Sequence, residues 1–210
     1  MIIIEDFGAR VASVWQGLRP STRSKVERAL STPIPQPATG VTAARRETVY
    51  DARSEWELSR LLAALDERAA EGGADALSAE QSRALRRMSE TCAAVLNREA
   101  RSSEVFAQLL ERALRARDYA RLDEVADVMT ARLAPTELCE TARHVNPAVR
   151  AVAQEALLQL PTSVLVALLG DPIDAEVARV ALECQADEYE SEEARLIVHA
   201  LEQVDAEEDF

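Results

Sequence analysis

The sequence lacks the long apolar run and the leader segment that would direct a chain into or across a membrane. No stretch approaches the ~20 consecutive apolar residues that a membrane-spanning helix requires. The apolar residues at positions 1–4 are followed directly by Glu5 and Asp6, without the basic segment of a signal peptide. We therefore expect a cytoplasmic protein with no membrane partner.

Cysteine, glycine and aromatic residues are scarce as well. The cysteines Cys92, Cys139 and Cys184 are odd in number, and each falls on the apolar side of an expected helix. We interpret them as buried, reduced thiols rather than a disulfide framework. Glycine occurs six times and aromatic residues make up 4% of the chain, whereas alanine is abundant and has the highest helix propensity. The composition predicts an all-α fold, with roughly three quarters of the residues in helices against about one third in an average protein.

Motifs of the common catalytic and nucleotide-binding sites are absent. The sequence contains no phosphate-binding or dinucleotide-binding glycine loop, no nucleophile elbow and no H-E-x-x-H. Its two histidines are His144 and His199. Glu140 and His144 share a helix face and could begin a metal site, but a zinc site uses three or four ligands, and none of the others lies nearby. We therefore expect no catalytic residue, no metal and no cofactor, and a protein that is not an enzyme.

The pattern of prolines and apolar residues divides the chain into four segments. Residues 1–30 are interpreted as an N-terminal helical hairpin. Residues 31–43 carry three alternate prolines, which hold the backbone extended and indicate a linker. Residues 44–204 form the predicted helical repeat domain, whose first helix is expected to begin near Ala44. Residues 205–210 are predicted to form an acidic tail.

Two amphipathic segments separated by 28 positions indicate a repeated structure. One begins at Asn146 and the other at Asp174, and in each the apolar residues follow the i, i+3, i+4, i+7 spacing of a helical stripe. The stripe residues are Val149, Val152, Ala153, Ala156, Leu157 and Leu160 in the first segment, and Val177, Val180, Ala181 and Cys184 in the second. Such short units bury their stripes against each other, which predicts an α-solenoid of antiparallel hairpins. An irregular all-α bundle is the alternative.

The first segment, Asn146-Pro147-x-Val149-Arg150-x-x-Ala153-x-x-x-Leu157, resembles the second helix of a HEAT repeat. Residues 143–182 are also similar to the bacterial leucine-rich-repeat variant. In the HEAT pattern, an Asp or Asn caps the second helix, and a Val-Arg pair and a small residue follow.

The second segment keeps most of this pattern in Asp174, Val177 and Ala181. It departs at Ala178, where arginine is expected, and Arg179 follows one position later. The resemblance covers residues 118–201. It implies an armadillo-like (HEAT/ARM-like) helical array that recognises other proteins, and by itself it implies no chemistry.

We therefore expect a non-catalytic protein–protein interaction scaffold. By exclusion from the apolar stripes, the candidate contact residues are Arg150, Gln154, Arg179 and Glu183. Residues 171–210 hold 14 acidic and 2 basic side chains, which suits either a solvated terminus or a docking surface for a basic partner protein. The pattern leaves the oligomeric state open.

The alternative function is nucleic-acid binding through arginine clusters between residues 83 and 121. The clustered residues are Arg83, Arg86, Arg87, Arg112, Arg115, Arg117 and Arg121. Acidic residues are interleaved among them, which favours salt-bridged helix surfaces over a phosphate-binding face. Trp56 lies at the edge of an expected stripe, and either core packing or a partner contact would explain it.

Overall fold

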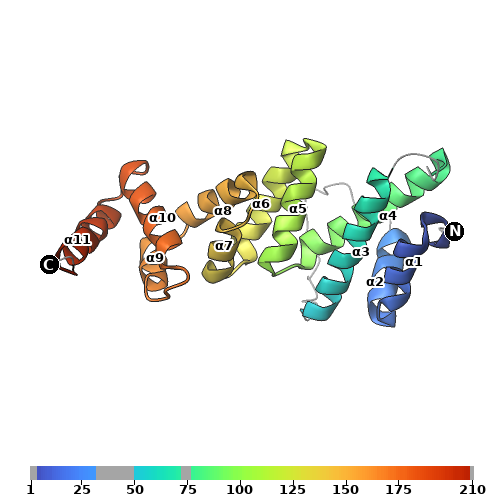
Figure 1. Cartoon of the computed structure of the whole chain (residues 1–210), viewed down its shortest axis with the longest axis horizontal. Helices are drawn as coiled ribbons and strands as arrows, with labels where there is room; N and C mark the ends of the chain where they lie inside the picture. The colour runs from blue at the N-terminus through green and yellow to red at the C-terminus, as the bar shows by residue number, and fades with distance from the viewer. Residues whose placement is uncertain (1–3, 32–49, 72–76, 209–210) are drawn as a thin grey trace, which may run out of the picture. The chain divides into compact units, whose positions relative to one another are not determined.

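The structure is a computed structural model that describes residues 4–31, 50–71 and 77–208, with side chains described as far as residue 203. Within these ranges the chain forms eleven α-helices and one 3-10 helix, without a β-strand (Figure 1). This confirms the predicted all-α class. The helices group into two compact units, Met1–Ala100 and Arg101–Phe210.

Each unit is a succession of helices. The first unit contains η1 (Ile4–Phe7), α1 (Ala9–Gly17), α2 (Pro20–Ser31), α3 (Ala52–Ala70) and α4 (Ala79–Glu99). The second unit contains α5 (Ser103–Ala116), α6 (Tyr119–Arg132), α7 (Pro135–Ala142), α8 (Pro147–Leu158), α9 (Thr162–Leu168), α10 (Ala175–Asp187) and α11 (Glu192–Glu208).

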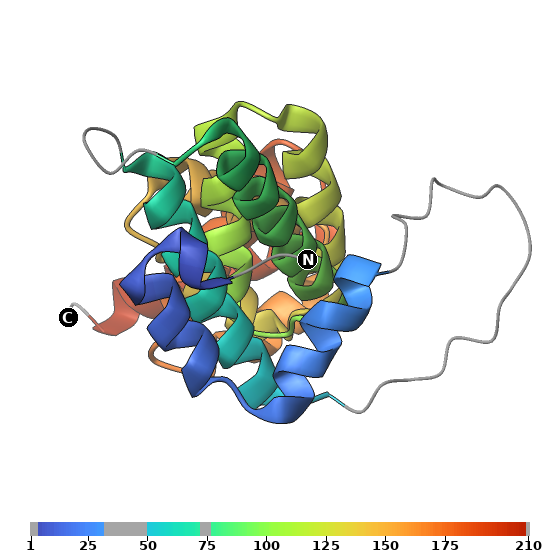
Figure 2. The same cartoon turned by 90° about the vertical axis from the view of Figure 1, so that its right-hand side faces the viewer.

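In the first unit, α3 and α4 pack against each other, and α1 and α2 cover them (Figure 2). The predicted stripe of α3 is buried at Leu58, Leu61, Leu62 and Leu65. Asp51 accepts a hydrogen bond from the Ser54 amide and caps α3, which begins at Ala52. Ala44 itself lies outside the described residues, as does the proline linker after Ser31.

Arg19, in the turn between α1 and α2, ties this helix pair to α3. Its Nε atom lies 3.1 Å from Glu57 Oε1, and its Nη2 atom lies 2.8 Å from Asp51 Oδ2. The Thr22 hydroxyl donates to Glu57 Oε2 at 2.5 Å. Burial alone would raise the pKa of Glu57, but the hydrogen bonds from Thr22 and Arg19 outweigh it and hold the pKa below its usual range.

Replacing Glu57 with alanine should remove about 3 kcal/mol from the free energy of unfolding at pH 7, because Arg19 and Thr22 lose their buried acceptor. The pKa of Glu57 is lowered in the folded protein. Its stabilising effect is therefore fully present above the pKa of the unfolded chain and is lost as the pH falls through the folded pKa. Urea unfolding should show the difference between wild type and variant shrinking below about pH 4.

The matched control is Glu67→Ala, which removes a pair 2.7 Å long between Arg10 and Glu67, with side chains 71% and 48% exposed. This change should alter the free energy of unfolding by less than about 1 kcal/mol. Equal losses of the free energy of unfolding in the two variants would show that the bonds of Arg19 and Thr22 to Glu57 do not stabilise the first unit.

The second unit is built from consecutive helices that pack in pairs. α5 packs against α6, α7 against α8, and α10 against both α9 and α11. Each of the helices α5 to α8 also contacts the helix two places further along. Neighbouring pairs therefore cover one another's apolar faces.

α8 and α10 begin 28 positions apart, at Pro147 and Ala175, as predicted, but their buried faces correspond at a shift of 29. The buried face of α8 contains Val149, Ala153, Ala156 and Leu157, and that of α10 contains Ala178, Ala181, Leu182, Gln185 and Ala186. A shift of 29 positions brings the four α8 residues onto Ala178, Leu182, Gln185 and Ala186. The stripe predicted for α10 was wrong apart from Ala181, and Val180 is 37% exposed.

The error came from treating Asp174 as a helix cap. Its side chain makes no capping hydrogen bond, and its Oδ1 atom instead accepts from Arg143 Nη1 at 2.8 Å. The start of α10 therefore does not fix which face of the helix is buried. At a shift of 29, Arg179 occupies the position of Arg150.

Two neighbouring substitutions in α10 test this register. Ala178→Leu should lower the free energy of unfolding by about 1–3 kcal/mol, because the added atoms enter a filled core. Val180→Leu, two positions later at a partly exposed site, should change it by less than about 0.5 kcal/mol. Thermal or urea unfolding measures both changes in the free energy of unfolding. A larger loss for Val180→Leu than for Ala178→Leu would support the register of 28.

Candidate interaction surface

Side-chain hydrogen bonds link successive helix pairs in the second unit. Arg143, which follows α7, reaches the turn before α10 and donates to the Ile173 carbonyl at 3.1 Å as well as to Asp174. The buried Gln185 of α10 donates to the carbonyls of Leu158 and Leu160 at 2.9 Å each. These bonds satisfy a carbonyl at the end of α8 and carbonyls in the turns before α9 and α10, and so fix α10 against the preceding helices.

A similar link joins α5 to α7. Ser103, at the start of α5, donates through its amide to Glu137 at 3.0 Å and through its hydroxyl to Glu140 at 2.6 Å. Two carboxylates therefore lie at the amino end of α5, where the helix dipole favours negative charge. These hydrogen bonds hold the turns and helix ends in place, so the outer faces of the helices keep fixed positions.

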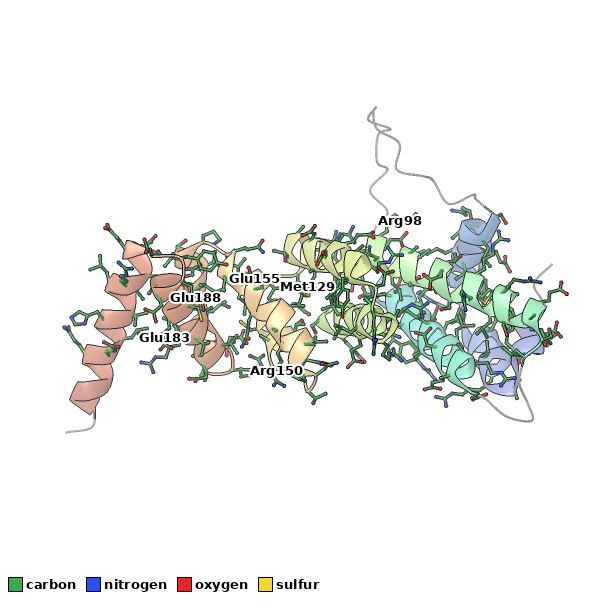
Figure 3. All side chains as sticks on the ribbon, turned by 90° about the horizontal axis from the view of Figure 1, so that it is seen from above. Arg98, Met129, Arg150, Glu155, Glu183 and Glu188 are labelled. Atoms are coloured by element: carbon green, nitrogen blue, oxygen red, sulfur yellow. The ribbon has the colours of Figure 1, made fainter. Side chains whose placement is uncertain are left out.

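The four predicted contact residues fall at two equivalent pairs of positions on α8 and α10. A shift of 29 residues relates Arg150 to Arg179 and Gln154 to Glu183. Gln154 and Glu183 are exposed, and Arg179 lies 3.8 Å from Glu183. Figure 3 labels Arg150 on α8 and Glu183 on α10. Arg150 instead donates to the carbonyls of His144 and Val145 at 3.0 Å each, so it also stabilises its own turn.

The apolar stripes of the last two helices are only partly buried. On α10, Val177 and Cys184 are half-buried and Val180 is exposed, so none of them is fully buried in the core of the second unit. On α11, Ile197, Val198 and Leu201 are half-buried. The helical spacing thus identified these α10 side chains as an apolar stripe but assigned them to the core.

Carboxylates surround this stripe. Glu176, Glu183 and Asp187 are exposed on α10, and Glu188 and Glu190 follow it. Tyr189 is 54% exposed and donates its hydroxyl to Glu155 at 3.1 Å. That hydrogen bond to Glu155, together with its negative charge, raises the pKa of Tyr189.

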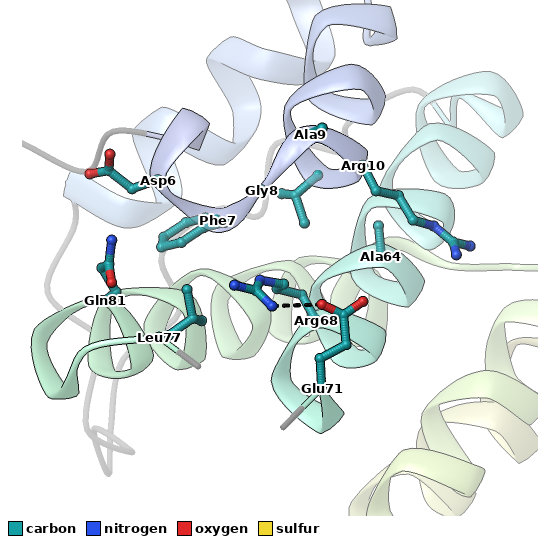
Figure 4. A pocket seen from close by; sticks show the side chains of 11 residues that line it. Asp6, Phe7, Gly8, Ala9, Arg10, Ala64, Arg68, Glu71, Leu77 and Gln81 are labelled. Atoms are coloured by element: carbon teal, nitrogen blue, oxygen red, sulfur yellow. Dashed lines mark hydrogen bonds and ion pairs between the residues drawn. The ribbon is translucent and has the colours of Figure 1, made fainter. Parts of the chain in front are cut away.

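A hollow lies in the first unit, where η1 and α1 meet α3 and the start of α4 (Figure 4). It measures about 530 Å³ and is lined by Phe7, Gly8, Arg68, Glu71 and Gln81 among others. Arg68 and Glu71 form an ion pair of 2.6 Å across it. The charged groups neutralise each other, so the hollow offers no poised acid, base or nucleophile.

Glu140 and His144 do not combine into a site. Glu140 accepts from Ser103, whereas His144 Nδ1 accepts from the amide of Asn146 at 3.2 Å. Among the described residues, no group of three or more His, Cys, Asp and Glu side chains is arranged to hold a metal ion.

The arginines between residues 83 and 121 belong to different units, and several are already engaged. Arg87 donates to the Leu30 carbonyl at 2.8 Å, and Arg121 pairs with Glu124 at 2.7 Å. Trp56 is 52% exposed, and the Arg60 guanidinium lies 4.7 Å from its ring centroid, so the core reading of Trp56 was wrong.

The sequence matches no protein-family model, and comparison with curated proteins and with solved structures gives no match either. In the part of the chain that the structure describes, no single helix is long and apolar enough to span a membrane. Only α8 and α9 together pass that test of length and composition, as a pair bent by 119°.

The buried thiol of Cys139 should react slowly with alkylating agents. Burial and, secondly, the Asp174 carboxylate raise its pKa from 9.0 to about 11, although Arg143 opposes this. At pH 8 its thiolate fraction should be about a hundredfold below that of an ordinary thiol. Mass spectrometry after iodoacetamide treatment should show slower labelling of Cys139 than of the half-buried Cys184. Equal labelling rates in folded and urea-unfolded protein would contradict the burial.

Proposed function

We propose that the second unit is a HEAT-like α-solenoid that binds another protein and catalyses no reaction. The observation that supports this most is the 29-residue correspondence between α8 and α10. It relates both the buried residues and the outward residues, so one helix face is repeated along the unit. Repeated helical pairs use such faces as extended binding surfaces.

The outward positions differ in charge, while the inward positions stay apolar except at Gln185, which takes the place of Ala156. Gln154 on α8 corresponds to Glu183 on α10, and Ala151 corresponds to Val180. Side chains at these exposed positions contribute little to stability, so they can vary between helices. Their identity can therefore determine which partner is bound. The growing negative charge toward α10 favours a basic partner protein over nucleic acid, whose phosphates it would repel.

The groups most suited to chemistry serve the packing of the unit. Glu140 holds the start of α5 through Ser103, and the Cys139 thiol is buried beside Asp174 and Arg143. A catalytic thiol needs the opposite environment, with a lowered pKa and access to substrate. A binding function fits these arrangements better than catalysis does.

Affinity capture with the full chain from its native host tests the proposal. We expect a co-eluting basic protein that is lost with the double variant Gln154→Arg, Glu183→Arg, because both changes reverse or oppose charge on the repeated face. The control is Asp123→Arg, which reverses one charge at an exposed position of α6 as Glu183→Arg does on α10. Retention of every co-eluting protein by the double variant would exclude this face as the binding surface.

A further inference from the structure

Three turns of the second unit lie along one edge, where α5 leads into α6, α7 into α8, and α9 into α10. The helices α5 and α7 contact each other, as do α7 and α9. Arg143, in the second of these turns, donates to the Ile173 carbonyl in the third at 3.1 Å. Asn146, also in the second turn, donates from Nδ2 to Oε1 of Glu111, near the end of α5, at 3.3 Å. We call residues 115–119, 143–146 and 169–174 the turn edge.

A large apolar side chain is exposed at each of these turns. Val145 is 86% exposed, Ile173 is 70% exposed, and Tyr119, the first residue of α6, is 65% exposed. An apolar residue directly before a helix cap often packs against the fourth residue of that helix. Val145 and Ile173 are too exposed for this packing, and the fourth residue of α8 is Arg150. The packing of the unit therefore does not account for these side chains.

The backbone that carries these side chains is held by hydrogen bonds. The Val145 carbonyl accepts from Arg150 Nη1 at 3.0 Å. The Ile173 amide donates to Asp171 Oδ1 at 2.9 Å, and its carbonyl accepts from Arg143. A side chain presented from a fixed backbone loses little conformational freedom on binding, which favours its use as a contact for a partner.

A hollow of about 430 Å³ lies beside the turn edge, between the end of α5 and the turn before α8. It is lined by Glu111, Leu114, Arg115 and Asn146. Leu114 is half-buried and contributes an apolar surface to the hollow, whereas Arg115 is exposed. The hollow can therefore receive one apolar side chain next to a positive charge.

The positive charge at the end of α5 is not neutralised by carboxylates. Arg115 donates to the Glu111 carbonyl at 3.4 Å, and Arg117 is exposed. Among the residues that the structure describes, neither guanidinium forms an ion pair. Asp118 accepts a hydrogen bond from the Arg121 amide, so this carboxylate serves as the cap of α6. A negatively charged ligand would meet two arginines here.

Arg117 also occupies a position at which the backbone favours another residue. Its φ of 54° and ψ of 33° are left-handed, and glycine is the usual residue in this conformation after a helix. Non-glycine residues held in such conformations cluster at functional sites. The exposed guanidinium is therefore better explained by a ligand than by the fold.

We propose that the turn edge binds an extended, acidic segment of a partner protein. Its apolar side chains contact Tyr119, Val145 and Ile173, and its carboxylates pair with the two arginines at the end of α5. Packed helices lie about 8–10 Å apart, and in a polyproline II segment residues three positions apart share one face and lie about 9 Å apart. An apolar side chain at every third position therefore reaches successive turns.

The charge of the arginines favours an acidic segment over a basic one. This inference goes beyond the proposed function, which concerns the outward faces of α8 and α10 and a basic partner. The two surfaces can therefore be tested separately.

Synthetic peptides test the chemistry of the ligand. The first peptide repeats leucine, glutamate and proline four times, so that leucine occupies every third position. The second has lysine in place of glutamate, and the third contains the residues of the first with all its leucines adjacent. Calorimetric titration of the full chain should show the first peptide binding at least about tenfold more tightly than either of the others.

Substitutions of the exposed apolar side chains locate the site. The double variant Val145→Ser, Ile173→Ser should weaken binding of the first peptide at least about tenfold, because two leucines lose their apolar contacts. The control Leu196→Ser makes a similar change at a side chain 73% exposed on α11 and should leave binding unchanged. Circular dichroism verifies that these variants remain folded.

A substitution of Arg117 separates binding from stability. Arg117→Gly should weaken binding of the first peptide about threefold. Its Tm should stay the same or rise, because glycine adopts the left-handed conformation without strain. The control Arg86→Gln removes one positive charge from an exposed position of α4 and should leave binding unchanged. A purely structural role of Arg117 would lower the Tm and leave the affinity as it is.

Several outcomes would overturn the turn edge as a binding surface. Equal affinity for the acidic and basic peptides would do so, as would equal affinity for the spaced and adjacent leucines. Equal effects of the double serine variant and Leu196→Ser would do so as well. The Gln154→Arg, Glu183→Arg variant should bind the first peptide at least as tightly as wild type, even where it loses the captured basic protein, so the two proposals can fail independently.

Discussion

The second unit depends on the burial of narrow apolar stripes on helices too short to be stable alone. α7 has 8 residues and α9 has 7, below the roughly 12–15 residues at which an isolated helix becomes even marginally stable in water. Each helix gains its stability from the neighbours that cover its stripe. Small residues such as Ala153 and Ala178, both fully buried, let the helices approach closely.

The same constraint explains the polar links between the pairs. A short helix leaves a large share of its backbone carbonyls and amides unpaired. Gln185 satisfies two such carbonyls, and Ser103 meets two carboxylates from α7. Because these bonds join different helix pairs, the unit fixes its register through its turns as well as through its core.

The sequence was sufficient to identify the helices wherever the cap was local. The capping box of Ser78 and Gln81 and the caps at Ser102, Asp118 and Asn146 all form as their spacing indicates. Sequence analysis assigned the wrong buried face to α10, because the side chain of Asp174 pairs with Arg143, 31 residues away. A carboxylate before a helix looks the same in sequence whether it caps the helix or pairs with a distant arginine.

That failure also explains why the apolar stripe was assigned to the wrong face of α10. α10 carries apolar residues on two faces, and periodicity alone cannot decide which face enters the core, because both have helical spacing. The spacing selected Val177 and Val180, whereas the buried face contains Ala178, Ala181 and Leu182, and Val180 is 37% exposed. The small Ala178 and Ala181 let neighbouring helices approach closely, and helical spacing does not record this preference for small side chains.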